Sequence, residues 1–245
     1  MNHPTKWALG VALSLTLILT GTGAAGGGVS AAAQKSPASE IKKVDDAVRV
    51  LEEMMRESDK GIPMELFEKC AGIAILPNVI KAAYIVGGRH GNGVIAVRGR
   101  DGRWSDPLFI GITGGSLGWQ IGVQSADVIL VFRTPQSVEN IRRGKFTLGA
   151  DAGVAAGPLG RSAEASTDAQ LKAEIYSYSR SRGLFAGLSV QGASLYVDGD
   201  ANQGFYGVKG IGPQEIIDGK VGNVPDAAGR LKSALGKYTG PSKYR

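Results

Sequence analysis

Apolar residues that recur every three or four positions predict an amphipathic helix that begins near residue 40. The apolar stripe consists of Ile41, Val44, Val48, Leu51 and Met55. Ser39 stands where an N-cap residue belongs, and Glu40 follows in the first turn, where the helix dipole favours a carboxylate. Gly61 and Pro63 then end this helix, and a short second helix is expected over Met64 to Lys69.

Beyond residue 70 the helical period gives way to short runs of Val, Ile and Gly that are broken by Gly, Asn-Gly and Asp-Gly. Such runs predict β-strands joined by tight turns, and Asp101-Gly102 is typical of a two-residue hairpin turn. Thr134 and Pro135 are expected to begin a short helix that extends through Arg143, because proline is favoured at the first helical position.

A further helix is expected near the C-terminus, from Pro225 onwards. Its apolar side consists of Ala228, Leu231, Leu235 and Tyr238. The chain also contains 37 scattered glycines, which in strands mark bends, bulges and close backbone packing. Together these patterns predict an α+β domain: a strongly curved antiparallel sheet or barrel-like β core, flanked by N-terminal and C-terminal helices.

The first 33 residues have the pattern of a secretory signal peptide. Lys6 is the only charge before an apolar run from Trp7 to Leu19, and Ala31-Ala32-Ala33 supplies an A-x-A cleavage site. The run is short for a membrane span, and a retained N-terminal anchor is the alternative. We therefore expect a signal peptide over 1–33, a linker over 34–39, one domain over 40–238 and a basic tail over 239–245. The protein is then exported: periplasmic, associated with the cell envelope, or secreted.

Composition and charge narrow the range of partners. With 43% hydrophobic and 20% charged residues, the chain has ordinary globular composition. Removing residues 1–33 takes one charged side chain, Lys6, from 28 basic and 22 acidic residues, so the mature net charge is +5. This mild charge argues against a nucleic-acid partner and favours membrane headgroups or acidic polymers. Cys70 is the only cysteine, so no internal disulfide can form, and a small buried side chain is expected there.

Two glycine motifs resemble catalytic or cofactor-binding sequences, but their context argues against both. Gly114 to Gly118 match G-x-S-x-G, yet a strand-like sequence follows Ser116, and His90 comes earlier, so a tight turn between two strands is expected. Gly91 to Ala96 match a dinucleotide-binding loop, yet the sequence continues as a strand and does not open a helix.

A third motif imitates a calcium loop. Asp198, Asp200 and Asn202 occupy the first ligand positions, but Gln203 and Lys209 stand where glycine and glutamate belong. Asp200 is instead expected to cap a short helix, with a calcium site of another kind as the alternative. Because the mature chain has one histidine, no cysteine pair and no compact carboxylate cluster, we expect a protein that is not an enzyme and holds no metal and no cofactor.

The segment Ile175–Gly192, IYSYSRSRGLFAGLSVQG, combines aromatic and cationic residues in one row. On a strand, four of them share one face: Tyr176, Tyr178, Arg180 and Arg182. Tyrosine suits a membrane interface and arginine can chelate phosphate, so this row is a candidate lipid-binding surface. Alternatively, the tyrosines pack beneath a neighbouring helix and the arginines pair with acids such as Asp198 or Asp200.

The same segment closely resembles the most recognisable part of the SYLF family, which comprises lipid-binding, Las17-binding-protein actin-regulator-like domains. Other segments resemble the family in the same order: EKCAGIAILPNVIKAAYIVGGRHGNGV, RWSDPLFIGITGGSLGWQIGVQSADVILVF, GKFTLGADAGVAAGPLGR and ANQGFYG. The resemblance extends from about Ile41 to Leu235. It implies a bacterial, exported member of a family whose eukaryotic members bind phosphoinositides and anionic membranes, and in some cases actin. For this chain it implies binding to anionic phospholipid in general.

In some eukaryotic members a basic amphipathic N-terminal helix assists membrane binding, and the matching helix here departs from that pattern. Residues 40–57 contain six acidic and four basic side chains, so packing on the sheet is expected instead. Only Lys42 and Lys43, at its beginning, are expected near phosphate groups. A second basic patch near the C-terminus is interpreted first as a solvated tail: Lys220, Arg230, Lys232, Lys237, Lys243 and Arg245.

Three functional hypotheses follow. The first is an exported, non-enzymatic domain that binds an anionic phospholipid membrane surface. Its lipid-binding residues are expected to be Lys42, Lys43, Tyr176, Tyr178, Arg180 and Arg182. The second is a structural or interaction protein whose curved sheet contacts another envelope protein. The third is a carrier that holds an acyl chain within the β core.

Overall fold

A computed structural model describes residues 36–56, 61–83, 86–117, 122–158, 173–181, 184–186 and 190–239. The chain divides into two compact units, Met1–Ala33 and Gln34–Arg245. The first unit coincides with the predicted signal peptide and lies outside the described residues, as do Arg182 and residues 240–245. The fold belongs to the second unit.

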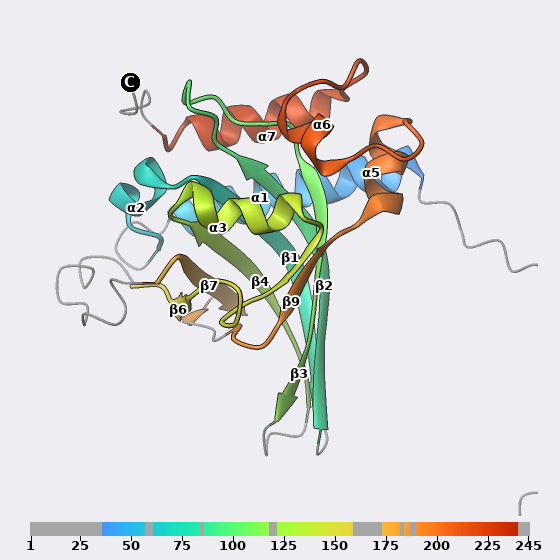
Figure 1. Ribbon diagram of the computed structural model, residues 1–245. Coiled ribbons are helices and arrows are strands. Elements are labelled where there is room, and N and C mark those ends of the chain that lie inside the picture. The colour runs from blue at the N-terminus through green and yellow to red at the C-terminus, as the bar shows by residue number, and fades with distance from the viewer. Residues whose placement is uncertain are drawn as a thin grey trace, which may run out of the picture. The chain divides into compact units, whose positions relative to one another are not determined.

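The described part of this unit contains one nine-stranded sheet in the order β5-β9-β3-β2-β1-β4-β7-β6, with β8 paired to β7 (Figure 1). The strands are β1 Gly72–Ala83, β2 Val86–Val97, β3 Leu108–Leu117, β4 Gly122–Phe132, β5 Lys145–Thr147, β6 Val154–Ala156, β7 Ile175–Ser181, β8 Leu184–Ala186 and β9 Ser194–Val197. The sheet curls into a half-barrel, which confirms the predicted α+β class. It is mixed rather than purely antiparallel, because β6 and β7 run parallel.

Local backbone chemistry shapes the long central strands. The pairing of β1 with β2 shifts register between Ile75 and Ile80, where Asn78 adopts a left-handed φ of 52°. The Asn78 N–H donates to Asp127 Oδ1 on β4 at 3.0 Å, which holds this irregularity in place. At Gly93 on β2, a Cβ would overlap the Ile75 carbonyl oxygen, so glycine is required for the two strands to approach.

Six helices accompany the sheet in the described residues: α1 Pro37–Arg56, α2 Met64–Lys69, α3 Pro135–Arg142, α5 Gly199–Tyr206, α6 Pro213–Ile217 and α7 Asp226–Gly236. As predicted, Thr134 caps α3, with its side chain accepting from the Ser137 N–H at 3.2 Å. Two predicted caps are wrong. The helix α1 already begins at Pro37 inside the expected linker, and Asp198 rather than Asp200 caps α5 by accepting from Ala201 N–H at 3.1 Å.

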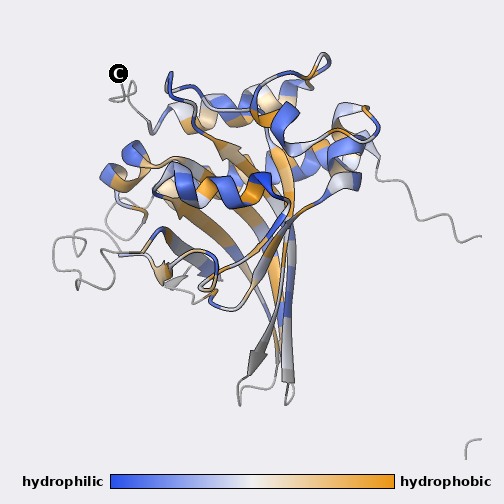
Figure 2. Cartoon of the chain, in the orientation of Figure 1, coloured by the Kyte–Doolittle hydropathy of each residue, from blue (hydrophilic) through white to orange (hydrophobic). Residues whose placement is uncertain are grey.

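The core lies between the sheet and the helices that cover it. From α1, Val44, Leu51 and Met54 are fully buried, and the helix contacts β1, β2, α5 and α7, so the predicted packing on the sheet is confirmed. Figure 2 shows the apolar colour concentrated on the strands where the helices lie. Among the helices that the structure describes, none is long and apolar enough to cross a membrane.

Two expected turns differ from the structure. Gly102 has a φ of 80°, its N–H donates to the Gly99 carbonyl, and the Gly99 N–H donates to the Arg103 carbonyl, which makes a three-residue loop instead of two. The G-x-S-x-G motif was expected to be a turn, but residues 114–117 form the end of β3, with Ser116 opposite Gly87. The glycines of β3 therefore do not end the strand, and its pairing with β2 continues as far as Leu117.

Candidate functional site

The predicted tyrosine–arginine row is not an exposed surface. Tyr176 and Tyr178 on β7 are almost completely buried, and so are Ser177 and Ser179 on the opposite face. The Tyr178 hydroxyl donates to the Pro158 carbonyl at 3.2 Å, and burial raises its pKa. Because β7 is paired with β4, β6 and β8 and covered on both faces, these rings do not reach a membrane surface in this conformation.

The cationic part of the row is held inside the fold as well. Arg180 forms an ion pair with Glu53 of α1, and the Arg133 guanidinium lies 5.4 Å from the centre of the Tyr176 ring. Burial of the tyrosines and pairing of Arg180 agree with this part of the alternative interpretation, although the acid is Glu53 and not Asp198 or Asp200. Arg182 lies outside the described residues.

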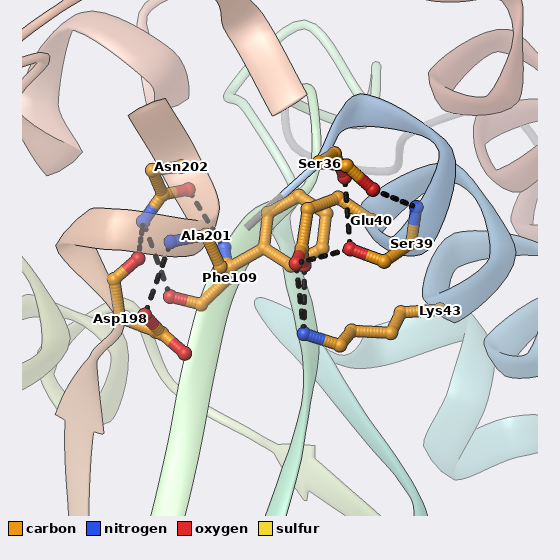
Figure 3. Close-up of polar contacts among 8 residues, drawn as sticks. All are labelled: Ser36, Ser39, Glu40, Lys43, Phe109, Asp198, Ala201 and Asn202. Atoms are coloured by element: carbon orange, nitrogen blue, oxygen red, sulfur yellow. Dashed lines mark hydrogen bonds and ion pairs between the residues drawn. The ribbon is translucent and has the colours of Figure 1, made fainter. Parts of the chain in front are cut away.

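Lys42 and Lys43 lie at the other end of α1. Lys43 Nζ forms an ion pair with the buried carboxylate of Glu40 at 2.8 Å, and the Ser39 hydroxyl donates to the same carboxylate (Figure 3). Lys42 is 74% exposed and contacts Asp46 at 2.7 Å. Thirteen residues of helix, or about 20 Å, separate Glu40 from Glu53, so the five predicted lipid-binding residues that the structure describes do not lie in one site.

The acidic character of α1 has an internal explanation. Asp45 binds Arg230 at 2.7 Å, and Glu52 binds Lys237 at 2.8 Å. Both basic residues belong to the C-terminal segment that was expected to be solvated. Asp45 and Glu52 of α1 therefore face cationic partners from α7 and its C-cap, which link these two segments.

The calcium-like motif is also structural. The buried Asn202 side chain accepts from the Phe109 N–H at 2.9 Å and donates to the carbonyls of Phe109 and Asp198 at 3.3 and 2.9 Å (Figure 3). Its amide thereby ties α5 to the backbone of β3. Cys70 is buried as predicted, its thiol donates to the Phe67 carbonyl at 3.1 Å, and burial raises its pKa to about 12. Such a thiol is unsuited to nucleophilic chemistry.

The structure reveals two surfaces that the sequence predictions missed. The first, here called the sheet tip, is the end of the four central strands that points away from the helices (Figure 1). Its described residues are 79–83, 86–91, 113–117 and 122–125. Ile80 and Val123 are 49% and 74% exposed, among the few large apolar side chains at the described surface. The register pairs Ala82 with Val123, so Ile80 and Val123 share one face of the sheet.

The second surface, here called the arginine cleft, lies at the opposite end of β2. It has a volume of about 690 Å³ between the end of β2, the Gly99–Arg103 loop and α3. Its cationic lining consists of Lys69, Arg98, Arg100, Arg133 and Arg142. Glu139 is the one carboxylate among its described lining residues. Cys70, Ala71, Val97 and Val138 supply an apolar floor.

Comparison with known proteins identifies the family. Residues 113–238 match the model of the Ysc84 family, described as "Las17-binding protein actin regulator". The chain belongs to the Ysc84 family. This confirms the resemblance on which the lipid-binding hypothesis depends.

Eukaryotic relatives match most of the chain. SH3 domain-containing YSC84-like protein 1 of Xenopus laevis is 38% identical over 182 residues, which cover 74% of this chain and 54% of the relative. Protein YSC84 of Saccharomyces cerevisiae is 36% identical over 213 residues, covering 85% and 45%. LAS seventeen-binding protein 3 of the same species is 36% identical over 188 residues, covering 74% and 40%. The chain thus spans about half the length of these relatives, one of which is named as a binding protein.

Proposed function

We propose that this Ysc84-family protein is exported and binds anionic phospholipid membranes, without catalytic activity, through the sheet tip. The observation that carries the proposal is the combination of exposed apolar side chains and basic groups at this end of the sheet. Ile80 and Val123 can enter the interfacial region of a bilayer, which removes their apolar surface from water and so stabilises the bound state.

The charges of the tip favour an anionic partner. Lys81 on β1 stands directly opposite Arg89 on β2, so two basic residues lie side by side at this end of the sheet. None of the described tip residues is Asp or Glu. Each basic residue near an anionic bilayer contributes about 1 kcal/mol, so Lys81 at this end of β1 favours a negatively charged surface.

The sequence of the adjoining connections points the same way. Residues 84–85 and 118–121, which lie outside the described part of the chain, read Tyr-Ile and Gly-Trp-Gln-Ile. Aromatic and aliphatic residues of this kind are enriched where proteins meet the membrane interface. Export is supported by the leader pattern of residues 1–33, and a bacterial envelope would present such proteins with anionic phospholipid.

A protein partner is the second candidate, and the names of the relatives support it. LAS seventeen-binding protein 3 is named for a protein that it binds. An exposed apolar patch such as that of Ile80 and Val123 also suits a protein interface. The two candidates differ in one measurable respect, because a protein partner does not require an anionic lipid.

The test is flotation of residues 34–245 with vesicles of phosphatidylcholine, alone or with phosphatidylglycerol. We expect binding that requires phosphatidylglycerol and weakens with salt. The variant Ile80→Asp/Val123→Asp should lose at least tenfold in affinity, since it removes two apolar contacts of about 1 kcal/mol or more and adds two negative charges. Lys81→Glu should also weaken binding.

The matched controls lie away from the tip. Val208→Asp changes another exposed apolar residue, and Lys209→Glu changes another basic one; both should bind within twofold of the wild type. Equal losses in control and tip variants, or wild-type binding to pure phosphatidylcholine at full strength, would contradict the proposal.

A further inference from the structure

His90 lies on the sheet tip beside the apolar residues on which the proposed membrane binding depends. The register pairs it with Ile80 of β1 on one side and with Thr113 of β3 on the other. Directly opposed residues of antiparallel strands share a face of the sheet, so His90 is on the face of Ile80 and Val123. His90 is exposed, as are both apolar residues. It therefore belongs to the surface that would meet a bilayer.

The basic residues of the tip belong to the other face. Lys81 follows Ile80 and Arg89 precedes His90, and neighbouring residues of a strand alternate between the two faces. Apart from Ile80 and His90, the register places only Ala, Gly, Val, Leu, Ser and Thr on this face of the described tip. Within the described tip, His90 is thus the one group on the apolar face that can change its charge.

The charged groups of α1 that lie near His90 already have partners. Lys43 and Asp46 line a groove of about 270 Å³ together with His90 and Ile80. Lys43 forms its ion pair with the buried Glu40 carboxylate at 2.8 Å, and Asp46 contacts a lysine of its own helix at 2.7 Å. A protonated His90 is therefore not required to neutralise Asp46.

His90 also stands alone in its titration range. Histidine is the side chain whose ordinary pKa, about 6.5, falls between pH 5 and pH 8. The sequence contains two histidines, His3 and His90, and only the second lies within residues 34–245. Burial raises the pKa of the single cysteine, Cys70, to about 12. A change in the binding properties of residues 34–245 between pH 7.5 and pH 5.5 would therefore point to one side chain.

We propose that His90 makes membrane binding by the sheet tip dependent on pH, so that attachment to anionic phospholipid strengthens in mildly acidic conditions. The inference rests on the proposed function of the tip. Protonation adds one positive charge to an otherwise uncharged face, directly beside Ile80. An anionic bilayer favours the protonated imidazole, so the bound protein holds more protons than the free protein, and its affinity rises as the pH falls. The expected gain is about fivefold, which corresponds to about 1 kcal/mol for one basic group near an anionic surface.

The experiment is flotation of residues 34–245 with mixed phosphatidylcholine and phosphatidylglycerol vesicles at pH 7.5 and pH 5.5. Wild-type protein should bind about fivefold more tightly at pH 5.5, and high salt should reduce this gain because exposed charges are screened. His90→Gln should bind with the same affinity at both pH values, about fivefold more weakly than the wild type at pH 5.5. His90→Lys carries a permanent charge and should bind at both pH values as tightly as the wild type does at pH 5.5.

The matched control moves the imidazole away from the tip. His90→Gln/Val208→His keeps one histidine, at the exposed position of Val208, which lies outside the tip. This variant should bind with the same affinity at both pH values, and circular dichroism at each pH confirms that every variant is folded. A pH response that persists in His90→Gln or His90→Lys, or that Val208→His restores, would overturn the proposal.

The same measurements separate this inference from the membrane proposal itself. If the wild type binds phosphatidylglycerol vesicles with equal affinity at both pH values, the role of His90 is contradicted and membrane binding by the tip stands. If the wild type binds at neither pH, the membrane proposal is contradicted, and the role of His90 falls with it. The Gln and Lys variants test the role of His90 independently, so a folding defect in one of them leaves the other to decide.

Discussion

The ion pair between Arg180 and Glu53 gives the sharpest test of how the tyrosine–arginine row acts. The two side chains are 20% and 26% exposed and join β7 to α1 across 127 residues of sequence. Exposed pairs contribute at most about 1 kcal/mol, whereas breaking a fully buried pair costs about 3 to 5 kcal/mol. Arg180→Ala should therefore lower the free energy of unfolding by an intermediate amount, about 2 kcal/mol.

The assay is urea unfolding of residues 34–245, followed by circular dichroism. With an m-value of about 2 kcal/mol per molar urea, the midpoint should fall by about 1 M. Arg49 also contacts Glu53, at 3.3 Å, but is half exposed, so Arg49→Ala should change stability by less than about 0.5 kcal/mol. A double-mutant cycle of Arg180→Ala with Glu53→Ala should give a coupling of about 1 kcal/mol.

Membrane binding decides between the two interpretations of the row. Arg180→Ala should bind phosphatidylglycerol vesicles as well as the wild type does, under conditions in which both are folded. A variant that keeps its full stability and loses vesicle binding would refute the structural assignment. It would return Arg180 to the lipid-binding role that the sequence suggested.

Two further predictions concern buried polar groups. Asn202→Ala should lower the free energy of unfolding by about 2 to 3 kcal/mol, because the buried Phe109 N–H loses its acceptor. Asp200→Ala, at an exposed position, should lower it by less than about 0.5 kcal/mol. Equal losses of stability in the two variants would contradict this role of Asn202. Native Cys70 should resist iodoacetamide at pH 8 and react after unfolding. Because its folded pKa is about 12 and its ordinary value 9.0, the thiol's contribution to stability should fall as pH rises from 9 to 12, an effect that Cys70→Ala should lack in pH-dependent urea unfolding.

The helices and long strands could be predicted because their signals are local. The stripe from Ile41 to Met55 and the Thr134-Pro135 cap each depend on residues within a few turns of one another. Pairings across the chain could not be predicted in this way. Asp45 and Arg230 are 185 residues apart, so neither the acidic α1 nor the basic C-terminal segment revealed its partner when considered alone.

The tyrosine row shows where alternation along a strand is insufficient. A period of two assigns Tyr176 and Tyr178 to one face, but it does not say whether either face is exposed. The opposite face carries small serines, and Ser177 donates to the Ala155 carbonyl of β6 at 3.3 Å. Small, uncharged residues on the second face are the signal that could have indicated a strand covered on both sides.

The sequence also contains a signal for the sheet tip, namely long segments without acidic residues. Residues 69–100 and 107–126 contain no Asp or Glu, although they include Lys81 and Arg89. Acidic residues elsewhere neutralise the cations of α1, α7 and β7, so the formal charge of the whole chain hides this asymmetry. Charge counted by segment, rather than over the chain, would have pointed to the central strands.

Under the proposed membrane binding, this distribution of charge distinguishes the tip from the α1–α7 side. Arg230 and Lys237 are already paired with Asp45 and Glu52 of α1. A bilayer that approached the α1–α7 side would have to break these pairs or bring its anionic surface close to carboxylates. At the tip no described carboxylate opposes such an approach. Compared with the α1–α7 side, the tip would therefore meet an anionic bilayer at a lower electrostatic cost.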